Sequence, residues 1–313
     1  SQRDVWAGPR GESAHIRVCA TGMVQVSTGS LPQGQGHETT MAQIVAHELG
    51  IPFENVEVLH GDTQGQPFGL GTYGSRSAAV GGTALHLCAG KIKEKMTRIG
   101  AHLLETAVAD VEYPDGGVSV KGVPDASKAF GDISMAAWLA SDLPPGEEGM
   151  LEATSFYDPP NCTFPFGPHI AMVEIEPETG VVEVVRYVAV DDVGPVINPM
   201  IVDGQLHGGI AQGVSQALYE KAVYDDNGQL ISGSMLDYTV PKATQLPSYE
   251  LDRTVTPSPV NPLGVKGVGE AGTIVSTPTV ANAVMDALAP LGVRDLDMPF
   301  TPDSVWRAIQ GTS

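Results

Sequence analysis

The chain has 313 residues, a formal net charge of −20 and only 17% charged residues. So acidic a protein is a poor match for nucleic acid or for an anionic membrane surface, since both are negatively charged; solubility is the simplest consequence of the charge. No apolar run approaches the roughly 20 residues needed to cross a bilayer, and the first ten residues contain no apolar core of a secretion signal. We therefore expect a protein without a membrane span.

In the first half of the chain, alternating Val and Ile predict two strands at 15–19 and 23–28 that turn at Gly22. Apolar residues at helical spacing then predict a helix that ends at Gly50. The following elements are a strand, a long helix weakened by glycines and a hairpin turning at PDGG, at residues 55–59, 77–109 and 113–120. Residues 143–168 are rich in Pro and Gly and are interpreted as a connector.

In the second half, two β-rich runs joined by the turn PETG precede a glycine-rich helix and a hairpin over DDNG. A strand and two helices complete the chain. The two β-rich runs are predicted at 169–174 and 181–190, and the glycine-rich helix at 202–218. The last strand is predicted at 249–255, and the two final helices at 278–291 and 303–310. Strand pairs that alternate with helices indicate an α+β protein with mixed sheets, rather than a parallel doubly wound sheet.

The three cysteines, Cys19, Cys88 and Cys162, are far apart and odd in number. They match neither a disulfide framework nor a CxxC metal site, so we expect free thiols in a reducing compartment. The histidines show no metal-ligand spacing and no HExxH. Because the cysteines do not cluster, any iron–sulfur cluster must be carried by another chain, and free thiols favour the cytoplasm as the location of this protein. Because the chain does not begin with Met, we expect a processed protein or one piece of something longer.

Three glycine-rich segments are candidate ligand loops. The first, PQGQGHETT, places Gln33–Gly36 before a helix start, where free N–H groups suit phosphate or a polar heterocycle; such a segment is more often only a turn. The second, GTYGSRSAA, carries Arg76, either a bidentate phosphate clamp or an exposed side chain at a helix start. In the third, DGQLHGGIAQG, Gly208 and Gly209 indicate that another helix or a ligand approaches closely.

A fourth segment, VKGVGEAGT, holds one carboxylate, Glu270, among glycine and other small residues. Glycines let a backbone approach a ligand closely, so this carboxylate could act on a bound group. The alternative is that Glu270 only pairs with Lys266.

Taken in order, these segments resemble the xanthine oxidase family of molybdenum hydroxylases. They resemble the C-terminal half of the molybdopterin-binding large subunit, in the bacterial carbon monoxide and aldehyde dehydrogenase-like branch. The resemblance implies an α+β fold with two molybdopterin-binding subdomains. These would be residues 11–160 and 161–313, the second carrying the catalytic loop, after an N-terminal extension at 1–10.

The resemblance also implies the roles of individual residues. Glu270 corresponds to the catalytic base, and the metal needs no protein ligand because the pterin dithiolene holds it. The implied cofactor is molybdenum–molybdopterin cytosine dinucleotide. The implied cofactor-binding residues are Gln33, Gly34, Gln35, Gly36, Thr72, Tyr73, Gly74, Ser75, Arg76, Ser77, Ala79, Asn198 and Gln205.

The implied reaction inserts a water-derived oxygen at an electrophilic carbon of a small-molecule substrate and passes a hydride to the molybdenum centre. The sequence GVGEAGT favours an aldehyde or an N-heterocycle as substrate. The implied partners are the chain with the N-terminal half of the large subunit, a [2Fe-2S] subunit and an FAD subunit. The alternatives are a carbon monoxide dehydrogenase piece, a non-catalytic subunit that completes the cofactor cradle, or a stand-alone nucleotide-binding module.

Overall fold

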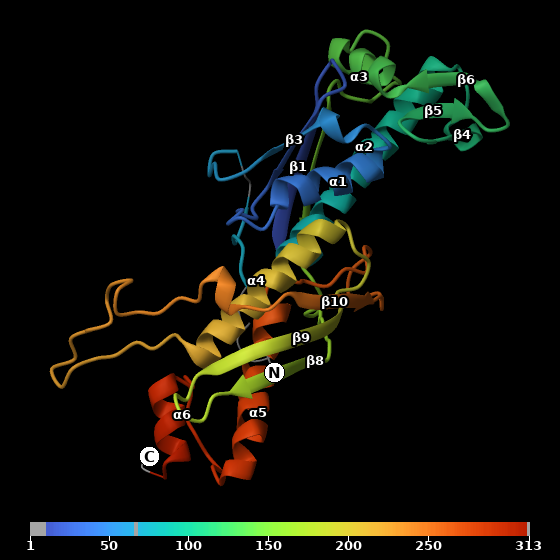
Figure 1. The fold of residues 1–313 in the computed structure, drawn as a ribbon. Coiled ribbons are helices and arrows are strands. Elements are labelled where there is room, and N and C mark those ends of the chain that lie inside the picture. Colours follow the sequence, from blue (N-terminus) through green and yellow to red (C-terminus); the bar gives the residue numbers. More distant parts are fainter. Residues whose placement is uncertain (1–10, 66–67, 312–313) are drawn as a thin grey trace. The chain divides into compact units, whose positions relative to one another are not determined.

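The computed structural model describes residues 11–65 and 68–311 (Figure 1). The predicted N-terminal extension, residues 1–10, lies outside this part. The chain divides into two compact units. Unit 1 comprises Ser1–Thr163 and Pro257–Gly267, and unit 2 comprises Phe164–Thr256 and Val268–Ser313. The segment Pro257–Gly267 thus belongs to unit 1. The predicted division after residue 160 places this segment in the second subdomain instead.

Unit 1 is built on a four-stranded sheet in the order β3-β2-β1-β7. Its strands are β1 (Glu12–Val18), β2 (Val24–Thr28), β3 (Val56–Leu59) and β7 (Leu151–Tyr157). β2 runs antiparallel to β1 and parallel to β3, so the sheet is mixed. The predicted strand pair at Gly22 and the α+β class with mixed sheets are confirmed.

Two helices pack with this sheet, α1 (His37–Leu49) and α2 (Gly82–Leu103). α1 ends where the sequence predicts, at Gly50, whose φ of 62° is the left-handed conformation that glycine adopts at little cost. A second, smaller sheet has the order β4-β5-β6, with helix α3 following β6. These elements are β4 (Val111–Glu112), β5 (Gly117–Val120), β6 (Val123–Ala129) and α3 (Phe130–Leu139).

Several predicted boundaries in unit 1 were wrong. The supposed connector at 143–168 contains β7, which pairs with β1 along its whole length; its alternating pattern was hidden by the Pro- and Gly-rich flanks. The long helix begins with a π-helical turn (Ser77–Gly81) and ends at Leu103, before Glu105 adopts a positive φ. β6 and α3 were not predicted.

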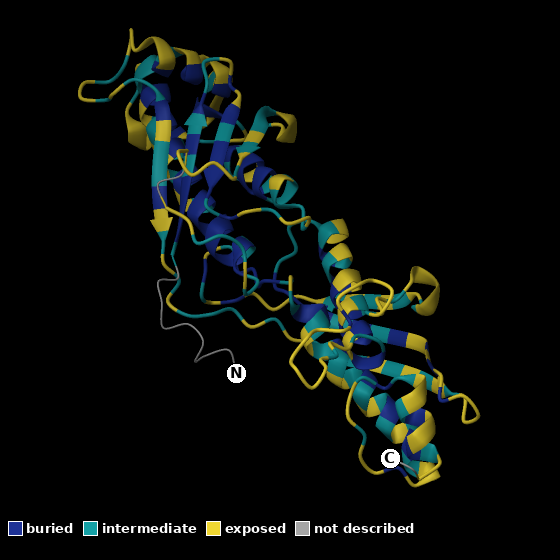
Figure 2. Cartoon of the chain, turned by 90° about the vertical axis from the view of Figure 1, so that its left-hand side faces the viewer, coloured by how far each residue is buried: buried dark blue, intermediate teal, exposed yellow. Residues whose placement is uncertain are grey.

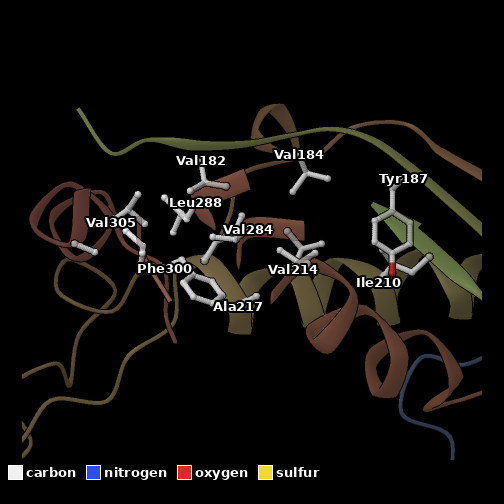
Figure 3. Close-up of a cluster of buried hydrophobic side chains, with 14 of the residues drawn as sticks. Val182, Val184, Tyr187, Ile210, Val214, Ala217, Val284, Leu288, Phe300 and Val305 are labelled. Atoms are coloured by element: carbon white, nitrogen blue, oxygen red, sulfur yellow. The ribbon is translucent and has the colours of Figure 1, made fainter. Parts of the chain in front are cut away.

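Unit 2 combines a three-stranded sheet, in the order β10-β9-β8, with three helices. Its elements are β8 (His169–Ile175), β9 (Val182–Asp192), β10 (Tyr249–Thr254), α4 (Pro199–Leu218), α5 (Ala271–Leu288) and α6 (Pro302–Ile309). Its core joins β9 to the helices: Val184 lies near Val214 of α4 and Val284 of α5 (Figure 3). Strand β8 alternates half-buried and exposed residues along its length. The helices bury one of their own faces and expose the other (Figure 2).

The helix predicted at 278–291 in fact begins at Ala271 and continues through Pro278. Proline is unfavourable inside a helix because it lacks the N–H that would hydrogen-bond to the preceding turn. Packing of α5 against α4 compensates for this missing hydrogen bond. The helix predicted at 202–218 begins earlier, at Pro199. The hairpin over DDNG is reduced to one isolated bridge, Tyr224 to Leu230. No helix in the described part of the chain is long and apolar enough to span a membrane.

Candidate functional site

The loop Gln33–Gly36 leads directly into α1. Gly34 and Gly36 have φ values of 104° and 72°, which L side chains rarely adopt, so both positions favour glycine. The Gln35 side-chain oxygen accepts a hydrogen bond from the Gln33 N–H, which closes the loop on itself. A Cβ on Gly34 would meet no described atom within 4 Å. The loop therefore presents an open face at the positive end of the α1 dipole.

Two buried polar atoms flank this loop without a hydrogen-bond partner among the described residues, the Ser30 Oγ and the His37 Nδ1. Burial lowers the pKa of His37, and the nearby His60 lowers it further, which favours a neutral imidazole. Buried polar atoms usually have partners, because leaving one unpaired costs free energy. A polar ligand beside the loop would supply the missing partners.

The GTYGSRSAA loop leads into the π-helical turn (Ser77–Gly81), and several of its residues have positive φ values. Gly71, Gly74 and Ser75 all have positive φ, which for a non-glycine residue such as Ser75 costs about 1–2 kcal/mol. The Thr72 and Ser77 hydroxyls lie 3.0 Å apart and hydrogen-bond each other. A π-helical turn is rare and often found at functional sites.

Two of the four sequence motifs meet in unit 1. A Cβ on Gly267, in the VKGVGEAGT motif, would lie 1.7 Å from the Ser75 carbonyl oxygen. Only glycine permits this approach, so the backbone at Gly267 lies directly on the GTYGSRS loop. The structure thus explains why position 267 is a glycine.

Arg76 is buried rather than exposed, and its guanidinium is held by partners within the chain. It is 8% exposed, and its Nη1 pairs with the fully buried Glu12 at 2.8 Å from Oε2. The guanidinium also donates to the Gly71 and Gly11 carbonyls at 2.9 and 2.7 Å. These partners take donors that a bidentate phosphate clamp would need, so Arg76 anchors its loop to β1. The expectation of an exposed arginine was wrong.

In unit 2, the glycines of α4 divide into two sets. A Cβ on Gly209 or Gly213 would clash with α5, at 2.9 Å from the Thr273 N and 1.8 Å from the Ser276 Oγ respectively. Gly204 and Gly208 would meet no described atom within 4 Å. Close helix packing, one of the two predicted explanations, therefore accounts for Gly209, whereas Gly208 lies on an open face.

Other predicted residues of unit 2 occupy helix starts. Asn198 caps α4, its Oδ1 accepting from the Ile201 N–H at 3.1 Å. Gln205 is half-buried in the second turn of that helix. Glu270 immediately precedes α5 and is half-exposed, and its carbonyl accepts from the Ile274 N–H. In unit 1, Lys266 is 7% exposed. No three His, Cys, Asp or Glu side chains cluster as a metal site within residues 11–65 and 68–311.

The family described as molybdopterin cofactor-binding domain matches residues 3–247. The chain belongs to this family. It is 46% identical to the carbon monoxide dehydrogenase large chain of Hydrogenophaga pseudoflava, over 96% of the chain and 37% of that protein. It is 40% identical to the nicotine 6-hydroxylase large subunit of Paenarthrobacter nicotinovorans, over 96% of the chain and 37% of that protein.

Among solved structures, a Cu,Mo-CO dehydrogenase in its carbon monoxide-reduced state matches with a TM-score of 0.93 and 41% identity. The match covers 99% of this chain and 39% of that one. The resemblance to the xanthine oxidase family is confirmed, and the chain spans a little over a third of the length of the curated relatives it matches.

The residues present fit the cofactor of a molybdopterin-binding chain. Gly34 leaves an open face, and the orphaned His37 Nδ1 and Ser30 Oγ offer polar partners beside it. His37 was missed as a candidate because a lone histidine carries no ligand pattern, although it stands within the QGQGHETT motif. Asn261, a buried residue with an unpartnered Oδ1, was also missed, and its surroundings VNPLG give no sequence signal.

Proposed function

We propose that this chain is the molybdenum-cofactor-binding, catalytic part of a multi-subunit hydroxylase or dehydrogenase. The observation that carries the proposal is the approach of Gly267 to Ser75, which joins the VKGVGEAGT and GTYGSRS motifs in unit 1. When bound, the cofactor supplies oxygen transfer from water and takes up two electrons. The protein's task is then to hold the cofactor and the substrate and to move a proton.

The cofactor is held by hydrogen bonds from this chain's loops. Gln35 and Gln205 each carry a donor and an acceptor, which suits a polar heterocycle. The N–H groups at the start of α1 favour negatively charged groups. Arg76 positions the Thr72–Ala79 loop through its pair with Glu12, rather than by binding phosphate itself. Asn198 contributes by fixing the start of α4, the helix that carries Gln205.

Glu270 is the general base of the proposal. Its carboxylate accepts the proton that an attacking water-derived oxygen must lose, a role that requires an ionisable side chain beside the reacting group. The place of Glu270 in the VKGVGEAGT motif supports this role, together with the similarity to a carbon monoxide dehydrogenase large chain over 96% of this chain. A non-catalytic subunit that only completes the cofactor cradle has no need of such an acid.

The finer features of the assembly are part of the same proposal. The cofactor is the cytosine dinucleotide form. The partners are the remainder of the large subunit, a [2Fe-2S] subunit and an FAD subunit, and the complex is cytoplasmic. The chain's span of about 37% of its relatives supports a need for further large-subunit sequence. Cys19, Cys88 and Cys162 are free thiols, consistent with a reducing compartment.

The substrate is an aldehyde or an N-heterocycle with an electrophilic carbon, supported by the similarity to a nicotine 6-hydroxylase. One observation favours carbon monoxide as a second candidate, the 46% identity to a carbon monoxide dehydrogenase large chain. Dye reduction by the assembled complex separates the candidates, with benzaldehyde, nicotine and carbon monoxide offered singly.

Metal and pterin analysis tests the proposal. We expect the complex of this chain with the rest of its large subunit to contain molybdenum and pterin, and this chain alone to contain neither. Gln35→Ala and Gln205→Ala should each lower the cofactor content, because each leaves a polar group of the cofactor unpaired at a cost of about 1–3 kcal/mol. A complex free of molybdenum and pterin, or full occupancy in both variants, would contradict the proposal.

A further inference from the structure

A cavity of about 70 Å³ in unit 1 lies beside the GTYGSRS loop and has no assigned role. Four of its lining residues are buried, Arg76, Ala79, Val80 and Asn261, whereas Tyr73 is exposed. The remaining lining residues are Gly74, Ser75, Tyr157, Pro159, Asn161, Cys162, Thr163 and Val260. The cavity is therefore lined by both buried and exposed residues, and two of them, Tyr73 and Tyr157, are aromatic.

One of the lining residues has a polar atom that lacks a partner. Asn261 is 7% exposed, and its Oδ1 has no hydrogen-bond partner in the described part of the chain. Its Nδ2 donates to the Val265 carbonyl at 2.9 Å. Because a carbonyl can only accept, that bond fixes which end of the amide is nitrogen, and the unpartnered atom is an acceptor.

This acceptor is rigidly placed. The segment around Asn261 is closed by backbone hydrogen bonds, from the Ser258 N–H to the Gly264 oxygen at 2.7 Å and from the Gly264 N–H to the Asn261 oxygen at 3.1 Å. The Tyr157 hydroxyl ties it to the end of β7 by donating to the Val260 carbonyl at 2.9 Å. A fixed, buried acceptor on a residue that lines a cavity favours a ligand that brings a hydrogen-bond donor.

We propose that this cavity receives the amino-bearing edge of a flat heterocycle of the bound cofactor, and that the Asn261 Oδ1 accepts a hydrogen bond from its exocyclic amino group. The inference rests on the proposed function. The volume of about 70 Å³ suits the edge of a ring rather than a whole nucleotide, so the rest of the molecule lies outside the cavity. The rings of Tyr73 and Tyr157 suit a flat partner. Two parts of a molybdopterin dinucleotide share this chemistry, the pterin and an amino-bearing nucleobase.

Matched ligands test the proposal and separate the two sources. The protein is the complex of this chain with the rest of its large subunit, produced in a host that cannot make the cofactor. Calorimetry compares cytidine 5′-monophosphate with uridine 5′-monophosphate, and pterin with lumazine. Within each pair, the first ligand has an amino group where the second has a carbonyl oxygen, which would face the Asn261 Oδ1 acceptor to acceptor.

We expect the amino-bearing member of one pair to bind at least about tenfold more tightly than its oxo counterpart, and that pair identifies the source. Asn261→Leu and Asn261→Asp both lose the bond to Val265, but only Asp keeps an acceptor. The preference should therefore vanish in Asn261→Leu and persist in Asn261→Asp. If Asn261→Leu does not fold, the wild-type comparison and Asn261→Asp still decide.

Equal binding within both pairs would overturn the proposal, as would no binding of any of the four ligands. Equal binding is also the outcome if water alone satisfies the Asn261 Oδ1. A preference that survives in Asn261→Leu would overturn it as well. Because the proposed function is judged by molybdenum and pterin in the cofactor-producing host, its failure is distinguishable from the failure of this inference.

Discussion

At the scale of single residues, the ion pair between Arg76 and Glu12 is a feature that distant parts of the sequence create. Removing one partner of a buried pair leaves an uncompensated charge, so Arg76→Met should lower the free energy of unfolding by about 3–5 kcal/mol. The control is Arg186→Met, which breaks a pair with Glu250 whose two side chains are 56% and 53% exposed. An exposed pair is screened by solvent, so breaking it should change the free energy of unfolding far less.

Urea unfolding of both variants measures this difference. Equal losses in the two variants would show that the pair in unit 1 is not desolvated as the structure places it. We also expect Arg76→Met to lower the cofactor content, because the Thr72–Ala79 loop would lose its anchor on β1.

Cys88 makes stability depend on pH in the alkaline range. Burial raises the pKa of its thiol from 9.0 to about 11, and its Sγ donates to the Ala153 carbonyl at 3.0 Å. Between these values the unfolded state loses a proton that the folded state keeps, so stability falls as pH rises from about 9 to about 11. Unfolding curves across this range should show a decline that Cys88→Ala reduces. An unchanged decline would contradict the assignment.

These residues also show what the sequence could not supply. The motif order identified Ser75 and the segment around Glu270 as candidates, and the structure brings the backbone of Gly267, in that segment, onto Ser75. The partner of Arg76 is 64 positions away in sequence, so no local pattern distinguished a loop anchor from a phosphate ligand. The sequence also offered no reason to select Asn261, because its burial and its missing hydrogen bond are properties of the fold.

At the scale of elements, the contact between α4 and α5 depends on small residues at specific positions. A Cβ on Gly213 would lie 1.8 Å from the Ser276 Oγ, whereas one on Gly208 would meet no described atom within 4 Å. Gly213→Ala should therefore lower the free energy of unfolding by about 1–3 kcal/mol through overpacking. Gly208→Ala should be neutral or stabilising by up to about 1 kcal/mol, because alanine favours helices.

Thermal unfolding of the two alanine variants checks this contrast. A similar melting temperature for both would mean that α4 and α5 do not pack at Gly213 as described. If Gly208→Ala keeps its stability but lowers cofactor content, the open face of α4 contacts the cofactor.

The elements that the sequence predicted correctly are those with a strong local signal. α1 has regular apolar spacing and a terminal glycine, and β1 and β2 alternate around Gly22. The failures have a common physical cause, which is tertiary contact outweighing local preference. α5 runs through Pro278 because Gly272 and Ser276 pack on α4, and β7 forms because β1 offers it an edge to pair with.

At the scale of the whole chain, the two units are not two consecutive stretches of sequence. Pro257–Gly267 returns to unit 1 before the chain enters α5 in unit 2. The order of the motifs in the sequence predicted the family. No local sequence pattern, however, indicates that a segment returns to the first unit. The return matters for function, because it brings Gly267 and Asn261 into the unit that carries the Gln33–Gly36 and Thr72–Ala79 loops.

Glu270→Gln tests the central claim most directly, because glutamine preserves the shape of the side chain but cannot accept a proton. In the complex of this chain with its partners, we expect normal molybdenum and pterin content together with a loss of turnover of about 10²–10⁴-fold. Glu178→Gln, at an exposed turn, is the control and should keep full turnover. Near-normal turnover of Glu270→Gln at full molybdenum occupancy would contradict the account.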